Sequence, residues 1–231
     1  MLRIILSGCR GRMGDEINQF CRTQSDVSIV AGFSKKTDPK GEYPIFSLYS
    51  HCTVDADVLV DFSHPDALPQ LLLYCKKYHL PAVLGVTGYS DRQLESIQDA
   101  STVLPIFRAA NFSLGANVLL KLTKTAAGAL GSIFDADIIE RHHRNKLDSP
   151  SGTAMMLSFA AERKLPIHSI RSGSTAGEHT VLFAGPNEVL ELTHRADCRS
   201  VYASGALRAA RFIAAADRPG LYGMEDLLGS E

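Results

Sequence analysis

The chain has 231 residues, of which 45% are hydrophobic and 21% are charged, and its formal net charge is -1 at pH 7. Single cores rarely grow beyond ~250 residues, so this length predicts one large domain or two small ones. The near-neutral charge excludes the global basic field typical of nucleic-acid-binding proteins, so anion recognition has to be local.

Five cysteines are scattered along the chain, and no two of them form a C-x-x-C pair. An odd, dispersed set favours a reducing compartment such as the cytoplasm over a disulfide framework or a zinc site. Residues 2–7 are expected to form a β-strand rather than the apolar part of a signal peptide. No apolar run approaches ~20 residues, so no membrane span is expected.

The first half of the chain alternates short apolar runs with helical patterns. We predict strands over 2–7, 27–33, 57–63, 81–87 and 102–107, and helices near 12–24, 65–79 and 90–100. Strands separated by helices imply a parallel sheet with right-handed crossovers, hence an α/β fold. The runs "VLVDF" and "AVLGV" are apolar almost throughout, as expected for strands that are covered on both faces.

The second half has a different pattern. A helix near 115–131 precedes a strand over 135–143, and another helix follows Ser151. Strands over 179–184 and 188–196 are joined by Gly185-Pro186-Asn187, which predicts an antiparallel hairpin, and a helix near 200–215 follows. We therefore expect a dinucleotide-binding domain over 1–110, a second domain over 111–211, and a tail over 212–231 that returns to the first domain.

A glycine loop follows the first predicted strand. Gly8, Gly11 and Gly14 form a G-x-x-G-x-x-G pattern at the start of a predicted helix. Glycines let the backbone approach a pyrophosphate, and a helix N-terminus supplies N–H groups and a positive dipole end. The pattern favours a nucleotide site, and the alternative is an ordinary tight turn.

The residues after the second predicted strand bear on the coenzyme. NAD sites usually place an acidic residue there, whereas this chain has Ser34, Lys35 and Lys36. These lysines, together with Arg12, could neutralise a 2'-phosphate, which favours NADPH over NADH. The alternative is a solvated pair of surface lysines.

The stretch "ERHHRNKLDSPSGTA" (140–154) gathers groups suited to acid–base chemistry and anion binding. His142 and His143 can donate protons near neutral pH, and Lys146 supplies a point charge. Ser151 suits a helix N-cap, with Gly152 and Thr153 in the first turn, where N–H groups can hold a carboxylate. The alternative is a charged loop before an ordinary capped helix. A metal site is disfavoured because no Cys or Asp/Glu set completes a coordination shell.

The sequence resembles the dihydrodipicolinate reductases, also called 4-hydroxy-tetrahydrodipicolinate reductases, of bacterial and plant lysine biosynthesis. The resemblance rests first on Glu140, His142, His143, Lys146, Asp148 and the "PSGTA" run (150–154). Further matches extend along the whole chain: "GRMG" (11–14), "DFS-x-P" (61–65), "GVTG" (85–88), "AANFSLGAN" (109–117), "GEHT" (177–180) and "LELTHRA" (190–196).

The resemblance implies an N-terminal Rossmann domain and a C-terminal domain with a mixed sheet, which binds substrate and in most members assembles a homotetramer. Hydride would pass from NADPH or NADH to a cyclic imine dicarboxylate. Catalysis is then assigned to His142 and Lys146. Substrate contacts are assigned to His143, Ser151, Gly152 and Thr153. Coenzyme contacts are assigned to Gly8, Gly11, Arg12, Met13, Gly14, Ser34, Lys35, Lys36, Gly85, Thr87, Ala109, Ala110, Asn111 and Phe112.

The chain departs from the family in three places: the segment after the second strand (about 35–56) and the connector over 162–173 are short, and Ser34 replaces the acidic ribose-binding residue. Two rival interpretations stand beside the reductase. One is another NAD(P)-dependent dehydrogenase of amino or imino acids, which would not need the His-His and "PSGT" array. The other is a nucleotide-binding redox sensor, which could lose His142, Lys146 and Thr153.

Overall fold

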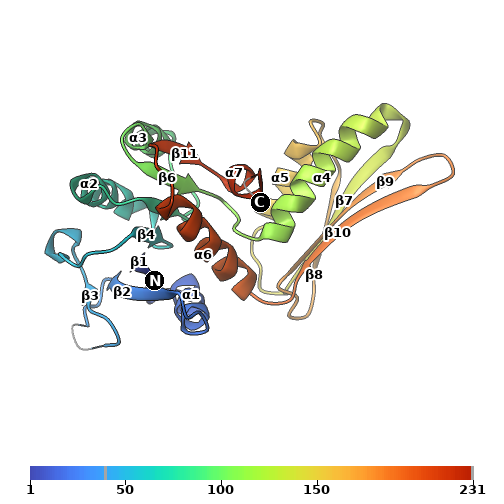
Figure 1. The fold of residues 1–231 in the computed structure, drawn as a ribbon. Helices are drawn as coiled ribbons and strands as arrows, with labels where there is room; N and C mark the ends of the chain where they lie inside the picture. Colours follow the sequence, from blue (N-terminus) through green and yellow to red (C-terminus); the bar gives the residue numbers. More distant parts are fainter. Residues whose placement is uncertain (39–40, 230–231) are drawn as a thin grey trace. The chain divides into compact units, whose positions relative to one another are not determined.

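The structure is a computed structural model that describes residues 1–38 and 41–229 (Figure 1). The chain folds into two compact units. The first unit comprises Met1–Phe112 and the segment from Tyr202 onward, and the second comprises Ser113–Val201. The chain thus returns to the first unit at Tyr202, earlier than the expected residue 212.

The first unit is built on a seven-stranded sheet in the order β11-β6-β5-β4-β1-β2-β3 (Figure 1). All six neighbouring pairs in it are parallel, which confirms the predicted α/β fold. Its strands are β1 (Leu2–Ser7), β2 (Val27–Phe33), β3 (Ile45–Phe46), β4 (Val58–Asp61), β5 (Ala82–Leu84), β6 (Pro105–Arg108) and β11 (Gly220–Tyr222).

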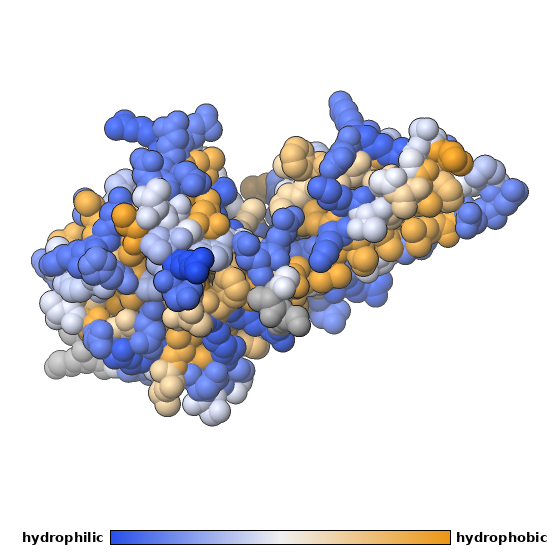
Figure 2. All heavy atoms as spheres, turned by 45° about the horizontal axis from the view of Figure 1, so that its top comes forward, coloured by the Kyte–Doolittle hydropathy of each residue, from blue (hydrophilic) through white to orange (hydrophobic). Residues whose placement is uncertain are grey.

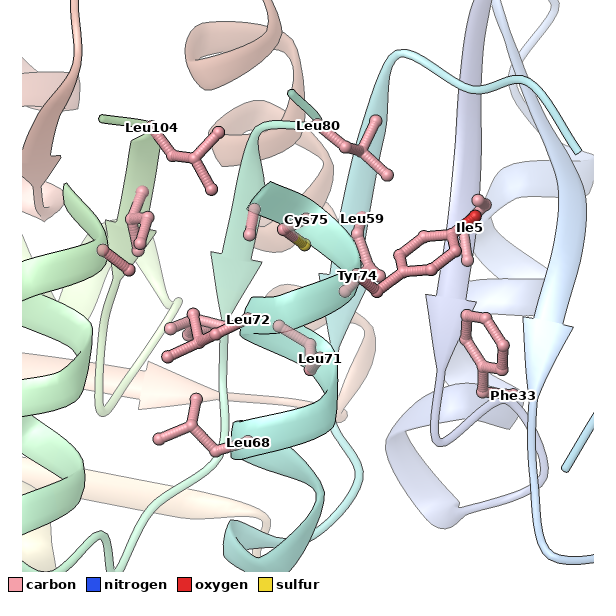
Figure 3. Packing of buried hydrophobic residues seen from close by; sticks show 14 of the residues in the cluster. Ile5, Phe33, Leu59, Leu68, Leu71, Leu72, Tyr74, Cys75, Leu80 and Leu104 are labelled. Atoms are coloured by element: carbon pink, nitrogen blue, oxygen red, sulfur yellow. The ribbon is translucent and has the colours of Figure 1, made fainter. Parts of the chain in front are cut away.

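Helices cover both faces of this sheet. They are α1 (Arg12–Arg22), α2 (Leu68–Tyr78), α3 (Asp91–Ser101), α6 (Ser200–Ala214) and α7 (Met224–Gly229), with 3-10 turns at Tyr49–His51 and Pro65–Ala67. On one face, Leu71 and Leu72 of α2 belong to the same buried cluster as Leu59 of β4 (Figure 3). On the other face, the rings of Phe107 in β6 and Phe212 in α6 lie 6.0 Å apart. Two covered faces explain why the central strands are apolar almost throughout.

The second unit is a four-stranded mixed sheet in the order β10-β9-β7-β8. Strand β7 pairs in parallel with β8 and antiparallel with β9, and β9 and β10 form the predicted hairpin. Its elements are α4 (Leu114–Leu130), a 3-10 turn (Gly131–Ile133), β7 (Asp135–His142), α5 (Gly152–Ala160), β8 (Ile167–Arg171), β9 (Gly177–Ala184) and β10 (Val189–Ala196). The mixed sheet that the resemblance implied is therefore present.

Helices α4 and α5 pack against one face of this sheet, where Ile138, Leu157, Val181 and Phe183 are fully buried. Alternation along β7 and β9 sends the intervening side chains to the opposite face. Figure 2 shows apolar atoms gathered over the second unit. Within the described residues, no helix combines the length and the apolar character that crossing a bilayer requires.

Among the strands and α-helices of the described residues, four short ones were not predicted: β3, β8, β11 and α7. Strand β8 lies in the short connector over 162–173, where no strand was predicted, and three of its five residues are exposed. An exposed edge strand carries little hydrophobic alternation, so its pairing with β7 was not visible in the pattern. Strand β6 begins at Pro105 rather than 102, because α3 extends to Ser101 and a turn follows it.

Candidate active site

A buried carboxylate lies at the centre of a polar network in the second unit. Glu140 is 0% exposed and accepts hydrogen bonds from Arg171 Nη1 at 2.8 Å and Nη2 at 2.6 Å. Its Oε2 lies 2.5 Å from His142 Nδ1, and its Oε1 accepts from the Ser151 backbone N–H at 3.2 Å. A buried charge is tolerated when it is paired and hydrogen-bonded in this way.

The network follows from strand geometry. Residues two apart on β7 face the same side, so Glu140 and His142 share the face that the helices cover. Register places Arg171 of β8 beside His142 and His179 of β9 beside Glu140. Three strands that are separate in sequence thereby bring Glu140, His142, Arg171 and His179 together.

Burial alone would raise the pKa of Glu140, but hydrogen bonds from Arg171, Ser169 and His142 outweigh it and lower that pKa to about 2. Burial lowers the pKa of His142, and Glu140 partly opposes this effect. Burial also lowers the pKa of His179 to about 4, and its ring lies 5.1 Å from that of His142. The imidazoles of His142 and His179 are therefore neutral near pH 7, whereas the carboxylate of Glu140, which contacts His142 and Arg171, is ionised.

The loop after β7 holds the other predicted catalytic residue. The His143 backbone N–H donates to Thr175 O at 2.8 Å, and the Lys146 N–H donates to His143 O at 3.1 Å. The Lys146 ammonium pairs with Asp148 Oδ1 at 2.9 Å and keeps the pKa of that carboxyl below its usual range. The Lys146 side chain is 22% exposed, so it is shielded but reachable. The ring of His143 is half-buried, and the structure shows no interaction that assigns it a role.

Helix α5 begins at Gly152, and Ser151 is its N-cap as predicted, because its hydroxyl accepts from the Ala154 N–H. The Ser151 side chain is buried and also hydrogen-bonded to His179 Nε2 at 3.1 Å. The structure thus places Ser151 in the framework of the network. Gly152 is exposed at the helix start, with Thr153 next to it, where the first N–H groups have no partner within the helix.

In the first unit the glycine loop joins β1 to α1. Gly8 has φ +78°, and the Gly8 N–H donates to Phe33 O of β2 at 3.0 Å. A Cβ on Gly8 would lie 2.6 Å from Phe62 O, and one on Gly14 would collide with the backbone of Cys9, so neither position has room for a side chain. Gly11 is the N-cap of α1 and makes no side-chain cap, with Arg12 and Met13 in the first turn.

The residues after β2 include an ion pair that was not predicted. Ser34 donates its backbone N–H to Phe46 O, and the side chains of Lys35 and Lys36 are exposed. Arg10 of the glycine loop pairs with Asp38 at 2.8 Å, so a cation and a carboxylate also lie at this end of the sheet. Arg10 is not one of the loop glycines, and Asp38 follows the end of β2 by five residues, so the motif did not indicate either residue.

Further predicted coenzyme residues lie at the carboxyl ends of β5 and β6. Gly85 follows β5, and a Cβ there would collide with the Phe62 ring. Phe112 packs against Phe62 and Phe107, with ring centroids 5.3 and 6.0 Å apart. Thr87 and Ala110 are exposed, and Ala109 and Asn111 are half-buried. Because all strands are parallel, these residues and Gly8 share one edge of the sheet, where ligands of open α/β sheets bind.

Besides Arg10 and Asp38, the sequence did not single out Arg171, His179 or Phe62 as residues of these sites. The matched segments "GEHT" and "DFS-x-P" contained His179 and Phe62, but no spacing rule assigned them a role. Among the residues that the structure describes, no group of three or more His, Cys, Asp or Glu side chains is placed so that it could hold a metal ion.

A parallel sheet with a glycine loop at its carboxyl edge is the architecture that binds dinucleotides, and the second unit adds a buried acid–base network. The class is therefore that of Rossmann-type oxidoreductases with a second unit built on a mixed sheet. The chain belongs to the dihydrodipicolinate reductase family: it matches the family's N-terminus over residues 2–112 and its C-terminus over residues 115–228.

Its relatives include the 4-hydroxy-tetrahydrodipicolinate reductase of Clostridium novyi, which is 42% identical, with 100% of both chains covered. The protein of the same name from Caldanaerobacter subterraneus is 40% identical, with 99% of this chain and 98% of that one covered. A solved structure, dipicolinate-bound dihydrodipicolinate reductase from Paenisporosarcina sp. TG-14, is 26% identical with a TM-score of 0.86 and covers 98% of this chain and 99% of its own.

Proposed function

We propose that this protein reduces 4-hydroxy-tetrahydrodipicolinate to tetrahydrodipicolinate with a reduced nicotinamide dinucleotide, a step of diaminopimelate and lysine biosynthesis. The observation that carries the proposal is the position of His142. It lies in a fixed hydrogen-bond network, followed by Lys146 and the start of α5. Proton donor, cation and anion-binding helix start are the groups that reduction of a cyclic imine dicarboxylate requires.

In this proposal His142 protonates the substrate as hydride arrives, and Lys146 stabilises negative charge or assists as an acid. His143 contacts the substrate. Backbone N–H groups at the start of α5 and the Thr153 hydroxyl hold a carboxylate, because the positive end of the helix dipole favours an anion there. Ser151 supports this arrangement by capping the helix and bonding His179.

The first unit suits the coenzyme. The glycine loop has no room for side chains at Gly8 and Gly14, and among the described residues no side chain caps the N-terminus of α1. That geometry leaves N–H groups for a pyrophosphate. The bound dinucleotide supplies a hydride. Gly85, Thr87 and residues 109–112 would line the nicotinamide end. Lys35, Lys36 and Arg12 are exposed cations near the adenosine end and favour NADPH over NADH.

The uncovered face of the mixed sheet supports the homotetramer that the resemblance implied. Strand register sends Ile139, Ile170 and Leu182 to this face together with Arg141 and Glu178, and Arg141, Ile170, Ser172 and Thr175 line a hollow of about 260 Å³. A mixed apolar and charged sheet face suits contact with another copy. All five cysteines are free, and we propose a cytoplasmic location on that ground.

A coupled assay tests the proposed reaction. Dihydrodipicolinate synthase, pyruvate and aspartate semialdehyde generate the substrate, and loss of reduced nicotinamide is followed after this protein is added. We expect turnover with both coenzymes, dependent on the synthase. Coenzyme oxidation that does not depend on the synthase, but that requires amino acids or other imino acids, would instead indicate the rival dehydrogenase.

His142→Gln tests the assigned proton donor. A positioned general acid contributes roughly 10²–10⁴-fold, so kcat should fall by that factor while KM changes less. Near-normal kcat in this variant would remove His142 from the role and leave the overall reaction intact.

A further inference from the structure

We propose that Glu140 is the positioning residue of the active site: it holds His142 with its proton on Nδ1 and directs Nε2 toward the substrate. This inference rests on the proposed function, because it takes His142 as the proton donor. Glu140 itself touches neither substrate nor coenzyme in this account. It acts through His142 and is in turn held by Arg171 and by the backbone of Ser151.

The carboxylate is bound on both oxygens. Oε1 accepts from Arg171 Nη2 at 2.6 Å and from Ser151 N at 3.2 Å. Oε2 accepts from Arg171 Nη1 at 2.8 Å and lies 2.5 Å from His142 Nδ1. The guanidinium of Arg171 also donates to Asp148 O at 2.7 Å, so it is anchored outside the pair. A bidentate arginine contact fixes the plane of the carboxylate. The imidazole of His142 can then approach the remaining lone pair of Oε2 from one direction.

An ionised carboxylate can only accept hydrogen bonds, so the hydrogen between it and His142 belongs to Nδ1. The neutral ring then carries its lone pair on Nε2, and the acid form carries its transferable proton there. A Cβ built on Gly177 would lie 3.1 Å from His142 Nε2. A glycine at this position of β9 therefore leaves space beside the nitrogen that has to reach the substrate.

The charges around His142 explain why a carboxylate is needed. Arg171 on β8 and Lys146 in the following loop are cationic, and both lower the pKa of His142, whereas His179 on β9 is neutral near pH 7. Asp148 is paired with Lys146. Glu140 on β7 is the carboxylate in direct contact with the ring, so it offsets these cations when His142 takes up a proton.

The kinetic test compares Glu140→Gln with wild type across pH, using the single-turnover rate of coenzyme oxidation. The acid form of His142 is needed, so the rate falls as pH rises through the pKa of His142 in the substrate complex. Loss of an adjacent carboxylate lowers such a pKa by about 1–2 units, and the falling limb should move down by that amount. Glu162→Gln is the matched control, because Glu162 is exposed at the end of α5 and pairs with Lys124. The falling limb of the pH–rate profile of Glu162→Gln should stay at the wild-type pH.

If the falling limb of the pH–rate profile of Glu140→Gln stays at the wild-type pH, the positioning role is overturned, even when the rate itself is lower. Failure of the proposed donor is a separate result, because it appears as near-normal kcat in His142→Gln. The two hypotheses can therefore fail independently. Circular dichroism and thermal melting of each variant establish that it is folded before kinetics are compared.

A second measurement does not depend on the Glu140→Gln variant. Nitrogen-15 spectra of histidine-labelled wild-type protein, recorded above the pKa of His142, report which ring nitrogen carries the hydrogen. His142→Gln assigns the resonance by its disappearance. Hydrogen on Nδ1 is expected, and hydrogen on Nε2 would overturn the proposal whether or not Glu140→Gln folds.

Discussion

Gly205 provides a sharp test of the packing in the first unit. It lies in the interior of α6 and is buried. A Cβ at this position would overlap the Phe112 carbonyl oxygen and lie 2.8 Å from the Phe112 carbonyl carbon. Both atoms are backbone and cannot rotate away. Gly205→Ala should therefore push α6 away from the segment that carries Phe112.

Two opposing effects set the magnitude. Alanine in place of glycine within a helix is favourable by about 0.5–1 kcal/mol, whereas overpacking typically costs about 1–3 kcal/mol. A clash with backbone should lie at the upper end of that cost, so we expect a net loss of about 1–2 kcal/mol. For a chain of this size, that loss corresponds to a Tm lowered by roughly 2–8 °C.

Gly128→Ala is the matched control. Gly128 is also helical, in α4, and no atom lies within 4 Å of the position that its Cβ would occupy. Here helix propensity acts alone, so this variant should gain about 0.5–1 kcal/mol. Calorimetry and urea unfolding of both variants measure the difference. A Gly205→Ala protein that is as stable as wild type, or that shifts in the same direction as Gly128→Ala, would refute the packing argument.

The remaining predictions concern pH, coenzyme and substrate. The folded pKa of Glu140 is about 2 against an ordinary 4.5, and that of His179 is about 4 against 6.5. Acidification should therefore lower the unfolding free energy by roughly 3 kcal/mol for each group, between pH 6.5 and 4 for His179 and between 4.5 and 2 for Glu140. Urea titration across pH measures this loss, and His179→Gln should flatten the upper window; an unchanged slope there would exclude His179 as its source. Replacing both Lys35 and Lys36 with Ala should remove a preference for NADPH on the order of tenfold and leave NADH affinity nearly unchanged, with the wild-type preference shrinking as salt rises. Coenzyme titration at two ionic strengths checks this, and equal loss of both coenzymes would contradict it. Thr153→Val should weaken binding of a planar pyridine dicarboxylate far more than binding of coenzyme, because a hydroxyl donor to an anion is lost; equal inhibitor constants would place the carboxylate elsewhere.

The elements of the first unit could be predicted because their signals are local. The run "LRIILS", the glycines that follow it and the next amphipathic helix lie within the first 24 residues, and β1, the loop and α1 appear where the pattern placed them. The hairpin of β9 and β10 could be predicted for the same reason, because its turn residues separate two strands that are adjacent in sequence.

The short edge elements were not readable. Strand β11 pairs with β6 across more than a hundred residues of sequence, and β8 pairs with β7 although most of its side chains are exposed. Such strands are ordered by backbone hydrogen bonds to a partner rather than by their own hydrophobic pattern. A sequence pattern carries no record of which strand will be the partner.

The candidate site likewise has a part that the local sequence predicted and a part that it did not. The sequence by itself determined which stretch bears the chemistry, because His142, Lys146, Ser151 and Thr153 are close together in it and each residue type has a characteristic role. Tertiary structure alone decided what surrounds His142. Strand register places Arg171 of β8 and His179 of β9 next to Glu140 and His142. In these surroundings Glu140 is a buried carboxylate that is ionised and paired with Arg171. Burial and ion pairing set that charge state, and both depend on neighbours distant in sequence, so no reading of the local motif could supply them.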